Sequence, residues 1–152
     1  MMKKTAVLFL CTGNSCRSQM AEGWAHHLKS DILDAYSAGI IAQGLNPFAV
    51  QVMAEVGVDI SQQKSKTVDS LRGVDLDYVV TVCSHAHETC PTYFGDAQVV
   101  HHGFLDPPAM ARKVADQGGN ETDQLNCYRK VRDEIRAYIS SLPEALKENA
   151  HE

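Results

Sequence analysis

The chain has 152 residues, of which 44% are hydrophobic and 22% are charged. This length suits one globular domain with a sizeable core and is short for two, so we expect a single domain over residues 1–152. With 14 Lys and Arg against 19 Asp and Glu, the formal net charge is −5, which disfavours non-specific binding to nucleic acid or to an anionic membrane. Any anion that this protein binds must therefore be held by local groups.

The sequence offers no membrane span and no convincing leader. No stretch approaches the roughly 18 continuous apolar residues that a span requires. The apolar run at 6–10 follows two lysines, as in a signal peptide, but it falls short of the roughly 7 to 15 residues that such a region needs. The cysteines number five and form no regular framework, which suits a reducing compartment. We expect a soluble, cytoplasmic monomer.

Short apolar runs rich in β-favouring residues alternate with helical patterns along the chain. The runs occupy residues 6–10, 35–38, 78–82 and 98–104, and the helical patterns occupy residues 20–28, 48–56, 68–71 and 125–142. The alternation predicts an α/β fold: a single domain with a four-stranded parallel sheet and helices on both faces. Ligands of such a fold bind where the carboxyl ends of the strands meet.

The C-terminal third adds three expectations. Asn120 or Thr122 is predicted to cap the last long helix. Cys127 falls beside apolar residues of that helix, so we expect it to pack rather than to react. The acidic tail, 144–152, is predicted to be solvated.

The most informative segment follows the first predicted strand and opens the first long helix. A cysteine followed six positions later by an arginine is weak evidence by itself. Between a strand and a helix N-terminus, however, backbone N–H groups of such a loop turn inward, and Gly and Asn tolerate the left-handed conformations that it needs. The segment is therefore predicted to bind a tetrahedral oxyanion. Its residues are Cys11, Thr12, Gly13, Asn14, Ser15, Cys16, Arg17 and Ser18.

Cys11 has the surroundings of an activated nucleophile. The helix dipole, the loop amides and a hydroxyl bond from Ser18 favour its thiolate form, and Arg17 offers a planar fork to two oxygens of the anion. No general base is then needed. The alternative is that Cys11 is a buried strand-end cysteine and Arg17 a surface side chain. Cys16 is predicted to pack within the loop.

Another pair of cysteines follows the third predicted strand. Cys83 ends that strand, so in a parallel sheet it emerges at the same edge as Cys11. If residues 83–90 are helical, the Cα atoms of Cys83 and Cys90 lie about 10 Å apart, whereas a disulfide needs less than about 7 Å. A redox switch built from this pair would require local unwinding of a short helix.

Two other interpretations of this segment stay open. Cys83, His85, His87 and Cys90 could ligate a metal, although zinc sites usually take paired ligands from separated segments. Alternatively, the two cysteines could simply pack beside exposed histidines.

Asp106 is the third element of interest, because it lies just past the fourth predicted strand and before Pro107. A carboxylic acid on a rigid loop at this edge could protonate a leaving oxygen. An Asp before a Pro is also an ordinary turn.

Together, these segments resemble the thioredoxin-coupled arsenate reductases, which have the low-molecular-weight protein tyrosine phosphatase fold. The likeness covers essentially the whole chain. It rests on CTGNSCRSQMAE at 11–22, Val82-Cys83 with Cys90-Pro91, Gly103-Phe104 with Asp106-Pro107, and VRDEI at 131–135.

The resemblance implies a role for each matching residue and a reaction. The family's nucleophile falls on Cys11, its oxyanion-binding arginine on Arg17, its thiolate-stabilising hydroxyl on Ser18, its other redox cysteines on Cys83 and Cys90, and its acid on Asp106. The implied reaction is reduction of arsenate to arsenite, in arsenic detoxification. The implied reductant is thioredoxin, and no bound cofactor is needed.

The implied cascade is a series of thiolate attacks. Cys11 attacks arsenate while Asp106 protonates the departing oxygen. Cys83 then attacks the Cys11 sulfur, which releases arsenite and leaves a Cys11–Cys83 disulfide. Cys90 displaces Cys11, and thioredoxin reduces the resulting Cys83–Cys90 disulfide.

Some relatives bind potassium beside the loop, and the match here is incomplete. Asn14, Glu22 and Ser37 fall on the ligand positions, but Lys66 falls where such relatives carry an acid. Because the lysine ammonium supplies a positive charge itself, we predict no metal.

Two other functions compete with reduction of arsenate. The runner-up is a phosphatase acting on phosphotyrosine or small phosphate esters, since arsenate and phosphate are near-isosteres. Such a phosphatase would have no use for Cys83 and Cys90, and no aromatic pair near Asp106 forms a phosphotyrosine cleft. The third candidate is a non-catalytic redox sensor, for which the oxyanion loop would be superfluous.

Overall fold

The computed structural model describes residues 3–83 and 96–149, apart from the side chains of 148 and 149. Among the described residues no helix is both long and apolar enough to cross a membrane. The elements are β1 (Thr5–Cys11), α1 (Arg17–Lys29), β2 (Leu33–Gly39), α2 (Pro47–Glu55), the 3-10 helix η1 (Val68–Leu71), β3 (Tyr78–Thr81), β4 (Gln98–His101), α4 (Pro107–Asp116), α5 (Glu121–Ser140) and α6 (Glu144–Asn149).

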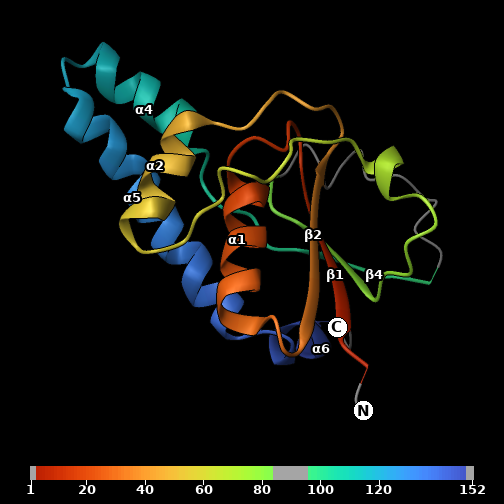
Figure 1. The fold of residues 1–152 in the computed structure, drawn as a ribbon. Helices are drawn as coiled ribbons and strands as arrows, with labels where there is room; N and C mark the ends of the chain where they lie inside the picture. The colour runs from red at the N-terminus through yellow and green to blue at the C-terminus, as the bar shows by residue number, and fades with distance from the viewer. Residues whose placement is uncertain (1–2, 84–95, 150–152) are drawn as a thin grey trace.

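The strands form one four-stranded sheet in the order β2-β1-β3-β4, and every pairing is parallel. This confirms the predicted α/β class and sheet. In Figure 1, α1 and α5 lie on one side of the strands and η1 lies on the other. Because β1 is flanked by β2 and β3, its carboxyl end lies in the middle of the edge where ligands of parallel sheets bind.

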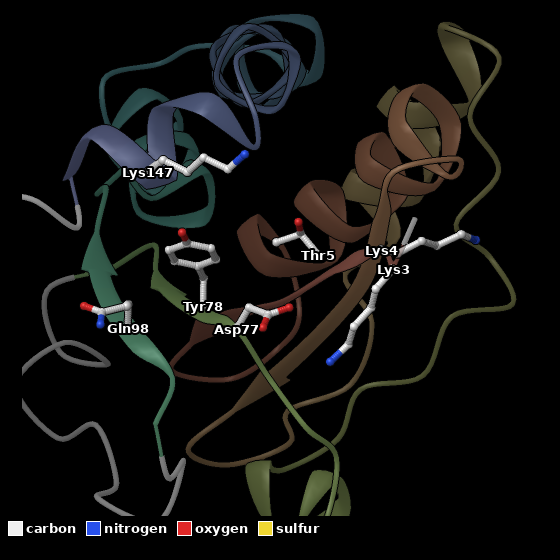
Figure 2. Close-up of a pocket in the computed structure, with 7 residues that line it drawn as sticks. All are labelled: Lys3, Lys4, Thr5, Asp77, Tyr78, Gln98 and Lys147. Carbon is white, nitrogen blue, oxygen red and sulfur yellow. The ribbon is translucent and has the colours of Figure 1, made fainter. Parts of the chain in front are cut away.

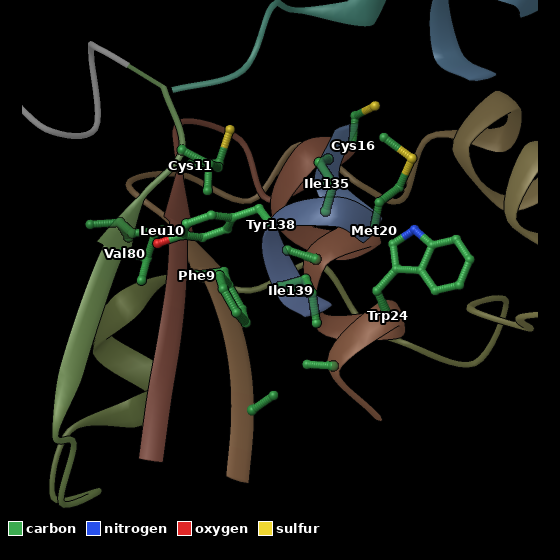
Figure 3. Packing of buried hydrophobic residues seen from close by; sticks show 14 of the residues in the cluster. Phe9, Leu10, Cys11, Cys16, Met20, Trp24, Val80, Ile135, Tyr138 and Ile139 are labelled. Carbon is green, nitrogen blue, oxygen red and sulfur yellow. The ribbon is translucent and has the colours of Figure 1, made fainter. Parts of the chain in front are cut away.

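The core lies between β1 and the helices α1 and α5. The four residues Val7, Leu8, Phe9 and Leu10 of β1 are fully buried, as a strand covered on both faces requires. Figure 3 shows Phe9 of this strand on the side of Ile139 of α5, with Met20 and Trp24 of α1 on that same side. Leu10, the next residue of the strand, points to the opposite face of the sheet. Burial of this apolar surface anchors the strand that ends at Cys11.

The structure corrects the predicted C-terminal part in two places. The segment after Asp106 is not merely a rigid loop but begins helix α4, with Pro107 and Pro108 in its first turn, where a missing N–H does no harm. The acidic tail is not simply solvated, because residues 144–149 form α6 and Leu146 is fully buried. One buried apolar residue is too little periodicity to predict an amphipathic helix from the sequence.

Asn120 is the cap of α5, as one of the two predicted alternatives. Its side-chain oxygen accepts from the N–H of Asp123 at 2.9 Å, and the Asp123 carboxylate accepts from the N–H of Asn120 at 3.0 Å. This reciprocal capping box satisfies two N–H groups at the helix start.

Candidate active site

Asn14 fixes the shape of the loop between β1 and α1. It has a φ of +48° and is fully buried. Its side-chain oxygen accepts from the backbone N–H of Lys66 and from Nε2 of Gln19, each at 2.9 Å, and its Nδ2 donates to Ser18 Oγ at 2.9 Å. These bonds offset the cost of a left-handed conformation in a residue other than glycine.

The segment after β2 supports the loop from outside. The N–H of Ile41 donates to Thr12 O and that of Gln43 to Gly13 O, both at 2.9 Å. Gly39 lies so close to the loop that a Cβ there would come within 2.7 Å of Asn14 N and 2.8 Å of Thr12 O. Only a glycine lets the two backbones approach this far.

Arg17 connects the loop after β1 with the segment around Asp106. It is the first residue of α1, and its side chain is 12% exposed. Its Nη1 donates to the carbonyl oxygen of Phe104 at 2.8 Å, and its Nη2 lies 3.6 Å from Asp106 Oδ1. The guanidinium therefore ties the oxyanion loop to the segment that precedes α4.

The loop opens into a cavity of about 390 Å³. Asn14 is the one predicted substrate-binding residue that does not line it, and Asn14 instead holds the loop from behind. Three lining residues were not predicted: Gln43, Pro108 and Arg112. Nothing in their spacing marks them, since long-range folding brings them to the loop. The lining residues are Cys11, Thr12, Gly13, Ser15, Cys16, Arg17, Gln43, Asp106, Pro108 and Arg112.

Another cavity, of about 370 Å³, lies at the opposite edge of the sheet and carries no cysteine. None of the residues predicted to be functional lines it. Of these two cavities, the one at the loop is lined by cysteines. The lining residues, shown in Figure 2, are Lys3, Lys4, Thr5, Asp77, Tyr78, Gln98 and Lys147.

Cys11 and Cys83 lie together at the carboxyl edge. Both are 6% exposed, and each thiol lies close enough to influence the protonation of the other. The Cys83 sulfur also lies 3.2 Å from Thr12 Oγ1. The structure thus places the predicted second redox cysteine against the predicted nucleophile.

The electrostatics of Cys11 differ from the sequence-based expectation. The hydrogen bond with Cys83 and then burial raise the pKa of the Cys11 thiol, while the Arg17 charge and the Thr12 N–H lower it without cancelling the rise. The Ser18 hydroxyl accepts from Asn14, and among the described residues it forms no bond to Cys11. The neighbouring Cys83 thiol thus opposes the predicted preference for a thiolate at Cys11, an effect that the sequence argument did not include.

The remaining cysteines divide between the described and undescribed parts of the chain. Cys16 and Cys127 are buried, 4% and 9% exposed, in keeping with packing roles. Burial raises the pKa of the Cys16 thiol, which makes it less reactive although it lines the cavity. Cys90, and with it the predicted switch and the alternative metal ligands His85 and His87, lies outside the described residues.

Lys66 occupies the place beside Glu22 that was predicted for a positive charge. Its Nζ lies 3.6 Å from Glu22 Oε1, and the Ser37 hydroxyl donates to the same oxygen at 2.6 Å. The Glu22 side chain is only 10% exposed, so it needs such partners. Asn14 is connected to Lys66 as well, because its side-chain oxygen accepts a hydrogen bond from the Lys66 N–H.

Comparison with known proteins agrees with this geometry. The family model for low molecular weight phosphotyrosine protein phosphatases matches residues 6–152. The arsenate reductase of Halalkalibacterium halodurans is 47% identical over 146 residues, which span 96% of this chain and 100% of that relative. The chain belongs to the arsenate reductases of this phosphatase family. The predicted family and fold are confirmed.

Solved structures of arsenate reductases share this fold. One, in its phosphate-binding state, is 29% identical with a TM-score of 0.72, over 91% of this chain and 95% of the other. A thioredoxin-dependent arsenate reductase from Corynebacterium glutamicum is 25% identical with a TM-score of 0.65, over 95% of this chain and 62% of the other.

Replacing Cys83 by Ala is expected to lower the pKa of Cys11, because it removes the largest cause of the rise. Alkylation requires the thiolate, so the pH at which Cys11 reacts at half its maximal rate should shift downward in the variant. Rates of reaction with iodoacetamide, followed by mass spectrometry of the Cys11 peptide from about pH 6 to 10, measure this shift. Cys127→Ala is the control, and an unchanged midpoint in Cys83→Ala would contradict the thiol pairing.

Proposed function

We propose that this protein reduces arsenate to arsenite by a relay through Cys11, Cys83 and Cys90, and that thioredoxin restores the thiols. The observation that carries the proposal is the buried pair of neighbouring thiols, Cys11 and Cys83, beside the loop that precedes α1. The names of the related arsenate reductases support the same reaction.

The first step is attack of Cys11 on arsenate. Thr12, Gly13, Ser15 and Cys16 line the cavity with Cys11, and their segment leads into the N-terminus of α1, where backbone N–H groups and the helix dipole favour an anion. Arg17 adds its guanidinium to the same site. Asp106 lies beside Arg17 and lines the cavity, so it is placed to protonate the oxygen that leaves arsenic.

The second step uses the contact between the two thiols. The Cys83 thiolate attacks the sulfur of the Cys11–arsenic adduct, a disulfide forms, and the electron pair of the sulfur–arsenic bond passes to arsenic. Arsenic(V) thereby becomes arsenic(III) and leaves as arsenite. The step starts from neighbouring side chains, because the Cys83 sulfur lies against the loop, 3.2 Å from Thr12 Oγ1, and interacts with the Cys11 thiol.

The pairing of the thiols also links their protonation states. A thiol next to a thiolate donates a hydrogen bond to it, so the two sulfurs titrate as a pair rather than independently. When the Cys11 sulfur is consumed in the adduct, that bond to Cys83 is lost. The step from adduct to disulfide then depends on deprotonation of Cys83.

The last steps regenerate the nucleophile. Cys90 attacks Cys83 and expels Cys11 as a thiolate, which gives a Cys83–Cys90 disulfide. Two thiols of thioredoxin then reduce this disulfide. The thioredoxin dependence named for the Corynebacterium glutamicum relative supports this choice of reductant.

Hydrolysis of phosphate esters is the alternative that the phosphatase family suggests. The loop, Arg17 and Asp106 would serve it equally well. Hydrolysis has no step for a second thiol, whereas reduction of arsenate needs one to form a disulfide with Cys11. The pair is therefore better suited to forming a disulfide.

Single-turnover experiments on reduced protein test the relay. With an excess of arsenate and no reductant, the wild type should release one arsenite per chain and hold a Cys83–Cys90 disulfide. Cys90→Ser should release one arsenite but hold Cys11–Cys83, and Cys11→Ser should release none. Arsenite is measured by chromatography and the disulfides by peptide mapping; repeated turnover in Cys90→Ser with thioredoxin present would overturn the relay.

We further propose that Lys66 replaces a bound cation, so exchange of potassium for sodium should leave the activity unchanged. Lys66→Met should lower the free energy of unfolding by about 1 to 3 kcal/mol, because Glu22 loses the lysine charge at 3.6 Å. Lys64→Met, at an exposed neighbouring position, is the matched control and should change it by less than about 0.5 kcal/mol. Urea unfolding measures both, and potassium-dependent activity of the wild type would contradict the proposal.

A further inference from the structure

Arg112 of α4 is a cationic side chain of the active-site cavity that the reaction above does not use. It lines the cavity together with Cys11 and Arg17. Pro108 lines it too, and residues four apart share one face of a helix, so α4 turns this face toward the loop. The two prolines at the start of α4 fix where that face begins.

Within the part of the chain that the structure describes, no carboxylate neutralises the guanidinium of Arg112. Among residues 3–83 and 96–149, no carboxylate forms an ion pair with it, whereas each of the other five arginines contacts a carboxylate or an aromatic ring. Those contacts are Arg17 with Asp106, Arg72 with Asp69, Arg129 and Arg132 with Glu55, and Arg136 with Trp24.

The charge balance of the cavity makes a second cation useful. Arg17 lies 3.6 Å from Asp106, so part of its charge is already balanced before a substrate arrives. Arsenate and phosphate carry up to two negative charges near neutral pH, and Arg17 alone cannot offset both. Arg112 raises the formal charge of the ionisable lining groups Arg17, Asp106 and Arg112 from zero to +1.

The surroundings of Arg112 locate its charge near the loop. Burial raises the pKa of Tyr128, and the charge of Arg112 acts in the opposite direction. The Tyr128 hydroxyl accepts from Asn46 Nδ2 at 3.2 Å, and the Asn46 N–H donates to Ser15 O at 2.9 Å. The charge of Arg112 therefore influences Tyr128, and hydrogen bonds through Asn46 connect Tyr128 to the loop between β1 and α1.

We propose that Arg112 is a substrate-binding residue: its guanidinium attracts and holds the doubly charged oxyanion at the outer wall of the cavity, while Arg17 and the loop bind it at the base. This inference rests on the proposed function and adds to it a residue that decides affinity rather than chemistry. An interaction made equally in the ground state and the transition state changes KM and leaves kcat unaltered.

Binding of inorganic phosphate, which the protein cannot reduce, tests the role of Arg112 without the redox reaction. In an NMR titration at low ionic strength, Arg112→Ala should raise the Kd for phosphate about fivefold to tenfold, the size expected of one charge acting on a dianion several Å away through water. Lys113→Ala removes the same charge from the same helix but not from the cavity lining, and should change Kd less than about twofold. Arg112→Lys should lie between Arg112→Ala and the wild type.

The salt dependence of phosphate binding and the kinetics of arsenate reduction distinguish a binding role of Arg112 from a merely structural one. The difference between wild type and Arg112→Ala should shrink at about 0.5 M salt, which screens charges over a few Å. The KM for arsenate should rise by the same factor as the phosphate Kd, with kcat unchanged. Equal affinities of wild type and Arg112→Ala for phosphate, or an equal loss of affinity in Lys113→Ala, would overturn the inference. If phosphate binds as described but the protein reduces no arsenate, the proposed function is wrong and the role of Arg112 in anion binding stands.

Discussion

The parallel pairing of β1 with β2 and β3 is the constraint on which the site depends. Its register sets Cys11 opposite Gly39 and Leu10 opposite Thr81. The chain leaving β1 therefore forms the loop, the chain leaving β2 supports that loop, and the chain leaving β3 delivers Cys83 two residues later. A slip in either pairing would separate the two thiols and remove the close approach at Gly39.

Around this edge, polar side chains hold the loop in its shape. Asn14 holds its left-handed conformation through bonds to Lys66, Gln19 and Ser18, and the Lys66 ammonium offsets the charge of Glu22. The loop is thus preorganised before substrate binds, which reduces the cost of ordering it during the reaction. In the proposed relay, Cys83 both raises the pKa of Cys11 and attacks it in the second step.

The sequence was sufficient to predict the elements whose signals are local. The strands, the helices α1, α2 and α5 and the edge at which Cys11 and Cys83 emerge follow from periodicity and from the geometry of parallel sheets. Helix α4 begins with two prolines directly after Asp106, which the sequence argument interpreted as a loop, and α6 has one fully buried residue, so neither helix was predicted. The raised pKa of Cys11 also escaped, since it depends on a thiol 72 positions away along the chain. Gln43 and Arg112 reach the cavity by long-range folding, which no spacing in a single sequence encodes.

The central claim is that the Cys11–Cys83 pair makes this site a reductase rather than a phosphatase. The most direct test is consumption of NADPH in the presence of thioredoxin and thioredoxin reductase when arsenate is added, with wild type and Cys83→Ser side by side. The account predicts arsenate-dependent turnover in the wild type and none in the variant. Absence of turnover in the wild type, together with hydrolysis of an aryl phosphate by both proteins, would contradict it and identify the loop as a phosphatase site.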